Sequence, residues 1–253
     1  IIFILGCLGA FFRLDINGVN NLKLSQSLIC VQPNIPWRMA YYSYQDNFYF
    51  RQILNRLTDY TAQIALREQQ GVFIFPELTL SDFNSSNKRI QQLFRQVTAT
   101  QFGLVIGARD GQYNTILGVN TQGDIVSRYY KQQLIPVFER DEPATERENL
   151  PVFTADKSDL FGLSLCYELL FPNISKQLVN QGAQLVGAIS FNSWLGNNNW
   201  PLLHAAYLPF RAVENKRPGI FVNNNGPSLA CDRFGRITHW IDIGKRGYFV
   251  TEH

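Results

Sequence analysis

The stretch GLSLCYELLFPN (162–173) is the most informative part of this chain about its fold. It overlaps an apolar run, LFGLSLC (160–166), with the length and composition of a buried strand, and the residues after it favour a short helix. Cys166 therefore sits where a strand ends and a helix begins. A helix N-terminus stabilises a thiolate, so we expect a lowered pKa for Cys166, although a single cysteine at a strand end is more often an inert core residue.

Two other motifs place charged side chains behind predicted strands. FIFPELT (73–79) puts Glu77 directly after an apolar strand and a proline, where partial burial would raise its pKa toward the range of a general base. RYYKQQLIPVFE (128–139) puts Lys131 close behind another strand, where a fixed positive charge can stabilise an oxyanion. Taken singly, each residue is more often a surface charge. Strand ends are nevertheless where an open α/β sheet presents side chains to a ligand.

Around these motifs, short apolar runs alternate with helical patterns, which predicts an α/β fold. Helices are expected at about 45–70, 86–100 and 200–216, with a short one after residue 166, and Pro209 should kink the last long one. Residues 27–253 continue without an internal linker, so we expect one domain there, with a long exposed loop at 141–150. Strands are expected at 27–32, 72–75, 103–107, 115–120, 124–130, 160–166, 184–190, 219–224, 228–232 and 247–252.

Composition argues against several functions. The 253 residues are 45% hydrophobic and 17% charged, as in a globular protein. The net charge of +3 and the scattered basic residues do not favour binding to nucleic acid. The four cysteines at 7, 30, 166 and 231 form no C-x-x-C pair, and the three histidines are dispersed. The sequence therefore predicts no metal site, no cofactor and no Ser-His-Asp triad.

The chain opens with IIFILGCLGAFF (1–12), an apolar run of 12 residues. This is shorter than the roughly 20 residues that cross a bilayer, and it lacks the basic leader and the cleavage site of a signal peptide. We interpret residues 1–26 as the end of a membrane helix followed by a linker, with a buried strand or helix as the alternative. Membrane association is therefore expected.

Taken together, the motifs FPE, YYK-x-x-L-x-P-x-x-E and CYE-x-x-FP, in this order, resemble the nitrilase (carbon–nitrogen hydrolase) superfamily. Three flanking segments are most similar to the catalytic domain of apolipoprotein N-acyltransferases: VQPNIPW (31–37), SFNSWLG (190–196) and HAAYLPFRAVENKRPGIFVNNNG (204–226). The resemblance runs from about residue 27 to residue 252. The chain departs from that family in a shorter stretch between Lys131 and Cys166. It also has SFNSW in the tryptophan loop, so Phe191 and Asn192 are expected to alter the pocket.

The resemblance implies a four-layer αββα sandwich in which Glu77, Lys131 and Cys166 converge. Glu77 would take the thiol proton, and Cys166 would attack an acyl carbonyl. Lys131 and the backbone amide of Tyr167 would then hold the oxyanion. The resulting thioester would be resolved by an amine or by water.

Several other residues receive supporting or structural roles. Glu139 is expected to orient Lys131 or the acceptor amine, and Glu168 to support the site. The candidates for lining an acyl pocket are Tyr130 and Trp194. Residues expected to be purely structural are Arg211 and Glu214, as an ion pair one turn apart on a helix, and Cys30 and Cys231, as inert core.

Three hypotheses about function follow. The first is a membrane-tethered acyltransferase that passes an acyl chain from a phospholipid to the N-terminal amine of a lipoprotein, on the periplasmic side of a bacterial inner membrane. The second is a hydrolase of the same superfamily that cuts a small amide or nitrile in the cytoplasm. The N-terminal apolar run favours the first. The third is a non-catalytic component of an envelope or conjugative-transfer assembly, which the intact Glu77, Lys131 and Cys166 argue against. The sequence does not indicate an oligomeric state.

Overall fold

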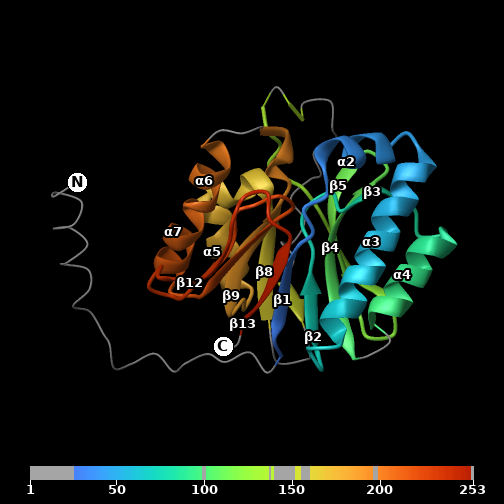
Figure 1. The fold of residues 1–253 in the computed structure, drawn as a ribbon. Helices are drawn as coiled ribbons and strands as arrows, with labels where there is room; N and C mark the ends of the chain where they lie inside the picture. The colour runs from blue at the N-terminus through green and yellow to red at the C-terminus, as the bar shows by residue number, and fades with distance from the viewer. Residues whose placement is uncertain are drawn as a thin grey trace, which may run out of the picture.

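Two β-sheets lie face to face between two layers of helices (Figure 1). This is the arrangement in the computed structural model, which describes residues 26–98, 101–136, 138–139, 152–154, 160–195 and 199–251. The apolar segment expected at 1–12 and the loop expected at 141–150 lie outside the described residues. The expected α/β class and αββα sandwich are both confirmed.

The first sheet has seven strands and joins the two ends of the described chain. Its parallel centre is flanked by antiparallel strands, and β13 pairs with β1 so that Leu28 lies opposite Thr251. The strands, in spatial order, are β13 (Gly247–Thr251), β1 (Leu28–Gln32), β2 (Gly71–Ile74), β4 (Phe102–Asp110), β5 (Tyr113–Val119) and β6 (Ile125–Tyr130), and β3 (Leu80–Phe83) pairs with β4.

The second sheet has six strands, with a parallel centre made of β8, β9 and β10. Its strands, in spatial order, are β12 (Ile237–Ile241), β11 (Ser228–Cys231), β10 (Gly219–Asn223), β9 (Leu185–Ser190), β8 (Leu160–Leu165) and β7 (Val152–Thr154). Parallel strands need helices or long connections between them. Here 3-10 helices and α-helices fill that role: η1 (Cys166–Leu170), α5 (Pro172–Asn180), η2 (Asn192–Leu195), α6 (Trp200–Ala205) and α7 (Tyr207–Asn215).

The alternation of side chains along β1 shows how the layers are held together. Leu28 and Cys30 enter the core that contains residues of both sheets, whereas Ile29 and Val31 pack with residues of the helices on the other side. These helices are α2 (Trp37–Ser43), α3 (Asn47–Ala65) and α4 (Lys88–Thr98). Because successive strand side chains point to opposite faces, a strand buried on both faces reads as the continuous apolar run LICVQ.

The sequence missed five short elements and one helix break. α2, β3, β7, η2 and β12 have three to seven residues and no strong periodicity. The helix expected at 200–216 is two helices, α6 and α7, separated at Ala206. Pro209 lies one turn beyond the break, and it has no N–H to donate to the carbonyl of Ala205. The predicted kink is therefore a full interruption. Within the part of the chain that is described, no helix combines the length and apolarity needed to cross a bilayer.

Candidate active site

Cys166 follows β8 directly and occupies an unusual backbone conformation. Its φ angle is 48°, in the left-handed region that costs a non-glycine residue about 1–3 kcal/mol and that clusters at functional sites. The side chain is buried, with 4% exposed, and η1 begins at this residue. The strand end therefore turns sharply and holds the thiol in one place.

Glu77 and Lys131 reach the same place from the other sheet. The Lys131 ammonium lies 3.1 Å from Glu77 Oε1, and Asn114 donates a 2.8 Å hydrogen bond to the same oxygen. The Phe191 N–H donates to Glu77 Oε2 at 2.9 Å, and the Cys166 thiol is a further hydrogen-bond partner of Glu77. The structure thus brings together the three residues that the sequence placed behind three separate strands.

Glu139 completes a chain of charges around Lys131. Its Oε1 lies 2.7 Å from the Lys131 ammonium, and its Oε2 accepts a 2.6 Å hydrogen bond from the Ile135 N–H. The Lys131 side chain is 1% exposed and that of Glu139 13%. One buried cation therefore faces two carboxylates, and Glu139 lies where the sequence expected a residue that orients Lys131.

The pKa values of this cluster follow from burial and mutual charge. Burial raises the pKa of Cys166, and the negative charge of Glu77 raises it further, to about 12. Burial alone would also raise the pKa of Glu77, but Lys131, Asn114 and the thiol outweigh it and hold that pKa below its usual value. The expectations of a lowered pKa for Cys166 and a raised one for Glu77 are both wrong. Burial and the Glu77 charge raise the pKa of Cys166, whereas the Lys131 charge and the hydrogen bonds lower that of Glu77 despite its burial.

Lys131 stays charged despite its burial. Burial opposes the ammonium form, but Glu77, Cys166 and Glu139 together raise the Lys131 pKa. At neutral pH the cluster therefore holds a thiol, a carboxylate and an ammonium. Sulfur can give its proton to the carboxylate as it bonds to an acyl carbon, because the negative charge then moves onto the carbonyl oxygen, where an ammonium and backbone amides can stabilise it.

Glu168 joins the loop that carries Lys131 to the loop that carries Cys166. Its Oε1 accepts hydrogen bonds from the Tyr129 hydroxyl at 2.7 Å and from the N–H groups of Gln132 and Gln133. Its Oε2 accepts from the Leu165 N–H at 2.8 Å. The side chain is fully buried, and burial raises its pKa. Glu168 thus contacts the neighbours of both residues, as a supporting residue would.

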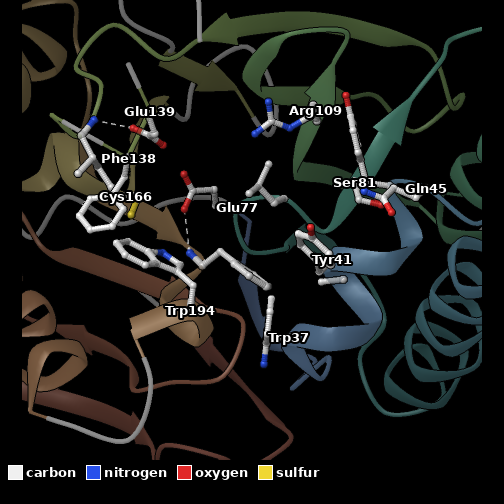
Figure 2. Close-up of a pocket in the computed structure, with 15 residues that line it drawn as sticks. Trp37, Tyr41, Gln45, Glu77, Ser81, Arg109, Phe138, Glu139, Cys166 and Trp194 are labelled. Carbon is white, nitrogen blue, oxygen red and sulfur yellow. Dashed lines mark hydrogen bonds between the residues drawn. The ribbon is translucent and has the colours of Figure 1, made fainter. Parts of the chain in front are cut away.

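A pocket of about 520 Å³ opens beside the cluster (Figure 2). Cys166, Glu77 and Glu139 lie at one end, and Arg109, Ser81 and Gln45 lie farther away in the view. Most of the remaining wall is apolar and aromatic: Trp37, Ala40, Tyr41, Tyr44, Leu78, Ile135, Phe138, Phe191 and Trp194. A carbonyl placed at Cys166 would therefore have its substituents in an apolar channel.

Comparison with known proteins identifies the family of the chain. Residues 30–239 match the carbon–nitrogen hydrolase family, which covers most of the chain. The chain belongs to the carbon–nitrogen hydrolase family.

Curated relatives within this family are apolipoprotein N-acyltransferases. Those of Shewanella oneidensis and Vibrio vulnificus are 27% and 30% identical over 64% and 62% of the chain. That of Thermotoga maritima is 24% identical over 88% of the chain. The matched regions span 36%, 35% and 44% of those proteins, so the chain corresponds to less than half the length of these relatives.

Solved structures share the fold. An amidase from Nesterenkonia has a TM-score of 0.65 at 16% identity, covering 93% of this chain and 94% of that one. Nit3 of Saccharomyces cerevisiae, a nitrilase-superfamily member, has a TM-score of 0.66 at 19% identity, covering 90% and 91%. At these identities the likeness concerns the fold alone.

One residue that was predicted to line the pocket does not line it. Tyr130 is not among the residues that line the pocket. Its hydroxyl lies 3.3 Å from Asp110, and its ring packs on Tyr113. The reason is the alternation along β6, which sends Tyr129 into the core and its neighbour to the opposite face. Trp194 does line the pocket, as expected.

The remaining predictions concern residues outside the cluster. Arg211 and Glu214 form the expected ion pair at 3.1 Å. Cys30 and Cys231 are buried, and burial raises the pKa of each thiol, which favours the inert role predicted for them. Phe191 lines the pocket as expected. Among the described residues, no group of His, Cys, Asp or Glu side chains could hold a metal ion.

Sequence reasoning missed the contacts that four polar residues make around the cluster. Asn114 holds Glu77, and Ser190 is a hydrogen-bond partner of the Cys166 thiol. Asn192 and His204 lie next to each other, and the His204 ring contacts the Cys166 carbonyl. Asn192 had been expected only to alter the pocket. Asn114 directly precedes the strand predicted at 115–120, and His204 is the first residue of the segment 204–226, but neither position indicated a contact with the site.

Proposed function

We propose that residues 27–253 are the catalytic domain of a cysteine acyltransferase that takes an acyl chain from a phospholipid and passes it to the N-terminal amine of a lipoprotein. Residues 1–26 would tether the domain at the periplasmic face of a bacterial inner membrane. The observation that carries the proposal is the buried Glu77, Lys131 and Cys166 cluster at one end of an aromatic pocket of about 520 Å³. A small amide needs far less apolar wall than this pocket offers.

The reaction would proceed in two steps. Cys166 sulfur bonds to the ester carbonyl carbon of the phospholipid while Glu77 takes the thiol proton. Lys131 and the Tyr167 N–H stabilise the oxyanion, and its collapse breaks the ester bond. The lysophospholipid alkoxide leaves with the proton from Glu77. In the second step the lipoprotein amine attacks the thioester, an amide forms, and the thiol regains a proton.

The similarity of the chain to apolipoprotein N-acyltransferases supports this choice of donor and acceptor. The aromatic wall supports it independently, because tryptophan and tyrosine side chains are suited to the boundary between lipid and water. Glu139 would orient Lys131, and Glu168 would hold the loop that carries Lys131 against the loop that carries Cys166. The mechanism calls for no cofactor.

The test is mass spectrometry of the protein after incubation with phosphatidylethanolamine in mixed micelles. We expect an acyl adduct on the peptide that contains Cys166, and no adduct there in the Cys166→Ala variant. Cys231→Ala is the matched control, since it removes another buried cysteine outside the pocket and should leave the adduct unchanged. A peptide with a lipid-modified N-terminal cysteine should then discharge the adduct faster than water does.

Two results would contradict the proposal. Release of ammonia from small amides, without any adduct from phospholipid, would make the chain a hydrolase of the same family. Cys166→Ala variants that retain every activity of the parent chain would mean that the chain is a non-catalytic member.

A further inference from the structure

The peptide bond that follows Cys166 has a partner that the reaction described above does not use. His204, on α6, places its ring Nε2 2.9 Å from the Cys166 carbonyl oxygen. The ring is partly buried and packs edge-on against Phe221, with ring centroids 5.0 Å apart. His204 is therefore held against the backbone of the nucleophile by its packing on Phe221 of β10.

The protonation of His204 follows from its two neighbours. A carbonyl oxygen can only accept, so Nε2 must carry the hydrogen and donate it to Cys166. Burial lowers the pKa of His204 to about 4, so the ring is neutral at physiological pH and Nδ1 is an acceptor. Nδ1 lies 3.2 Å from the side-chain amide of Asn192, which must then present its NH2 group to the ring.

That orientation of Asn192 also links the ring to the thiol. Side-chain amide oxygen and nitrogen are assigned from their hydrogen bonds. The same amide atom lies 2.9 Å from the Ser190 hydroxyl oxygen, so one NH2 group can donate to both His204 and Ser190. The Ser190 hydroxyl is then free to donate to Cys166, its other partner. Asn192 therefore orients both His204, which contacts the Cys166 carbonyl, and Ser190, which contacts the Cys166 sulfur.

A trans peptide is planar, so its C=O and N–H groups point in opposite directions. We propose that His204 is a positioning residue: by holding the Cys166 carbonyl it aims the Tyr167 N–H away from α6 as the preset backbone donor for the oxyanion. Tyr167 is among the first residues of η1, so its N–H has no carbonyl of its own turn to bond. The proposal rests on the acyl-transfer reaction described above.

Two features make this more than ordinary packing. The left-handed conformation of Cys166, with φ of 48°, needs its surroundings to hold it. Glu168 holds the Ser164–Leu165 peptide, one residue ahead of the peptide that enters the cysteine, by accepting from the Leu165 N–H, and His204 holds the peptide that follows Cys166. A hydrogen bond to the carbonyl also polarises the amide and strengthens its N–H as a donor.

The experiment compares one reaction that needs an oxyanion donor with one that does not. The first is the burst of p-nitrophenolate when p-nitrophenyl butyrate acylates Cys166. The second is the reaction with methyl methanethiosulfonate, in which Cys166 sulfur attacks sulfur and methanesulfinate leaves. Peptide mass spectrometry locates both products on Cys166. His204→Phe keeps the ring against Phe221 without a donor, and His204→Gln restores an amide N–H near the position of Nε2.

We expect His204→Phe to slow acylation by about 10- to 100-fold, as a misplaced oxyanion donor should. Its KM should be unchanged, and its reaction with methyl methanethiosulfonate should stay close to the wild-type rate. His204→Gln should recover most of the acylation rate. If His204→Phe does not fold, His204→Asn serves in its place, because its shorter amide cannot reach the carbonyl.

Several outcomes would overturn the proposal. Equal loss of both reactions in His204→Phe would show a general structural role, and so would failure of His204→Gln to recover acylation. If His204→Phe is acylated at the wild-type rate, the Cys166 carbonyl needs no hydrogen-bond partner for the reaction. If the wild-type chain forms no acyl-enzyme from either p-nitrophenyl butyrate or phospholipid, both this proposal and the proposed function are overturned. The other results overturn only the role of His204, because in them the wild-type chain still forms the acyl-enzyme.

Discussion

Replacing Lys131 with methionine should destabilise the protein and reverse the way its stability depends on pH. The side chain is 1% exposed and lies within 3.1 Å of Glu77 and 2.7 Å of Glu139. Methionine fills a similar volume but leaves both carboxylates without their cation. Removing one partner of a buried ion pair costs about 3–5 kcal/mol. For a domain of this size, that corresponds to a fall in Tm of about 6–20 °C at neutral pH.

Burial already raises the pKa of Glu139 in the wild type, so the reversal in pH dependence is expected from the pKa of Glu77. In the wild type this pKa is held below its usual value, so Glu77 contributes stability above its unfolded pKa and loses it as the pH falls through the folded value. In Lys131→Met, burial would become the main influence and would raise the folded pKa. The unfolded state would then lose its proton first, so stability should fall as the pH rises from about 5 to about 8.

The assay is thermal unfolding followed by circular dichroism in buffers across that pH range. Lys176→Met is the matched control, because Lys176 is exposed on α5 and its loss should change stability by no more than about 0.5 kcal/mol. Adding Glu77→Gln to Lys131→Met should recover part of the loss. If Lys131→Met matches the wild type in Tm at every pH, then Lys131 does not hold the two carboxylates ionised and the reasoning is refuted.

Three further predictions concern the packing beside Glu77, the pocket wall and the protonation of His204. A Cβ on Gly107 would lie 2.4 Å from the Glu77 Cα, so Gly107→Ala should displace the general base and slow acylation by about 100-fold. Gly103→Ala on the same strand, where the nearest atom is 3.4 Å away, should keep its rate. Trp194→Ala should raise KM about tenfold for long-chain p-nitrophenyl esters and leave short-chain esters unaffected; equal changes for both would contradict a role in chain binding. Because the His204 pKa falls from 6.5 to about 4 on folding, the unfolded state binds more protons in that window, and Tm should fall as the pH is lowered through it. His204→Gln should flatten that slope, and an unchanged slope would contradict the assignment.

The local pattern of the chain was sufficient for most elements. Apolar runs such as LICVQ and LFGLSL gave β1 and β8, because a strand buried on both faces has little choice of residue. The short elements α2, β3 and β12 were not predicted, because their few residues show little periodicity. The break at Ala206 was more complete than the predicted kink at Pro209. Pro209 has no N–H for the carbonyl of Ala205, so the two helices lack that hydrogen bond across the break.

The position of Cys166 illustrates what the sequence determined about the site. The sequence placed Glu77, Lys131 and Cys166 at the ends of three strands, and the resemblance of the three motifs to the nitrilase superfamily implied that they meet. The tertiary structure decided the rest. His204 reaches the Cys166 carbonyl from 38 residues away, and Tyr130 turns away from the pocket that Trp194 lines. The pKa directions of Glu77 and Cys166 reverse the local expectation, because each is set by the sum of burial and neighbouring charges, and that sum exists only once distant segments are packed together.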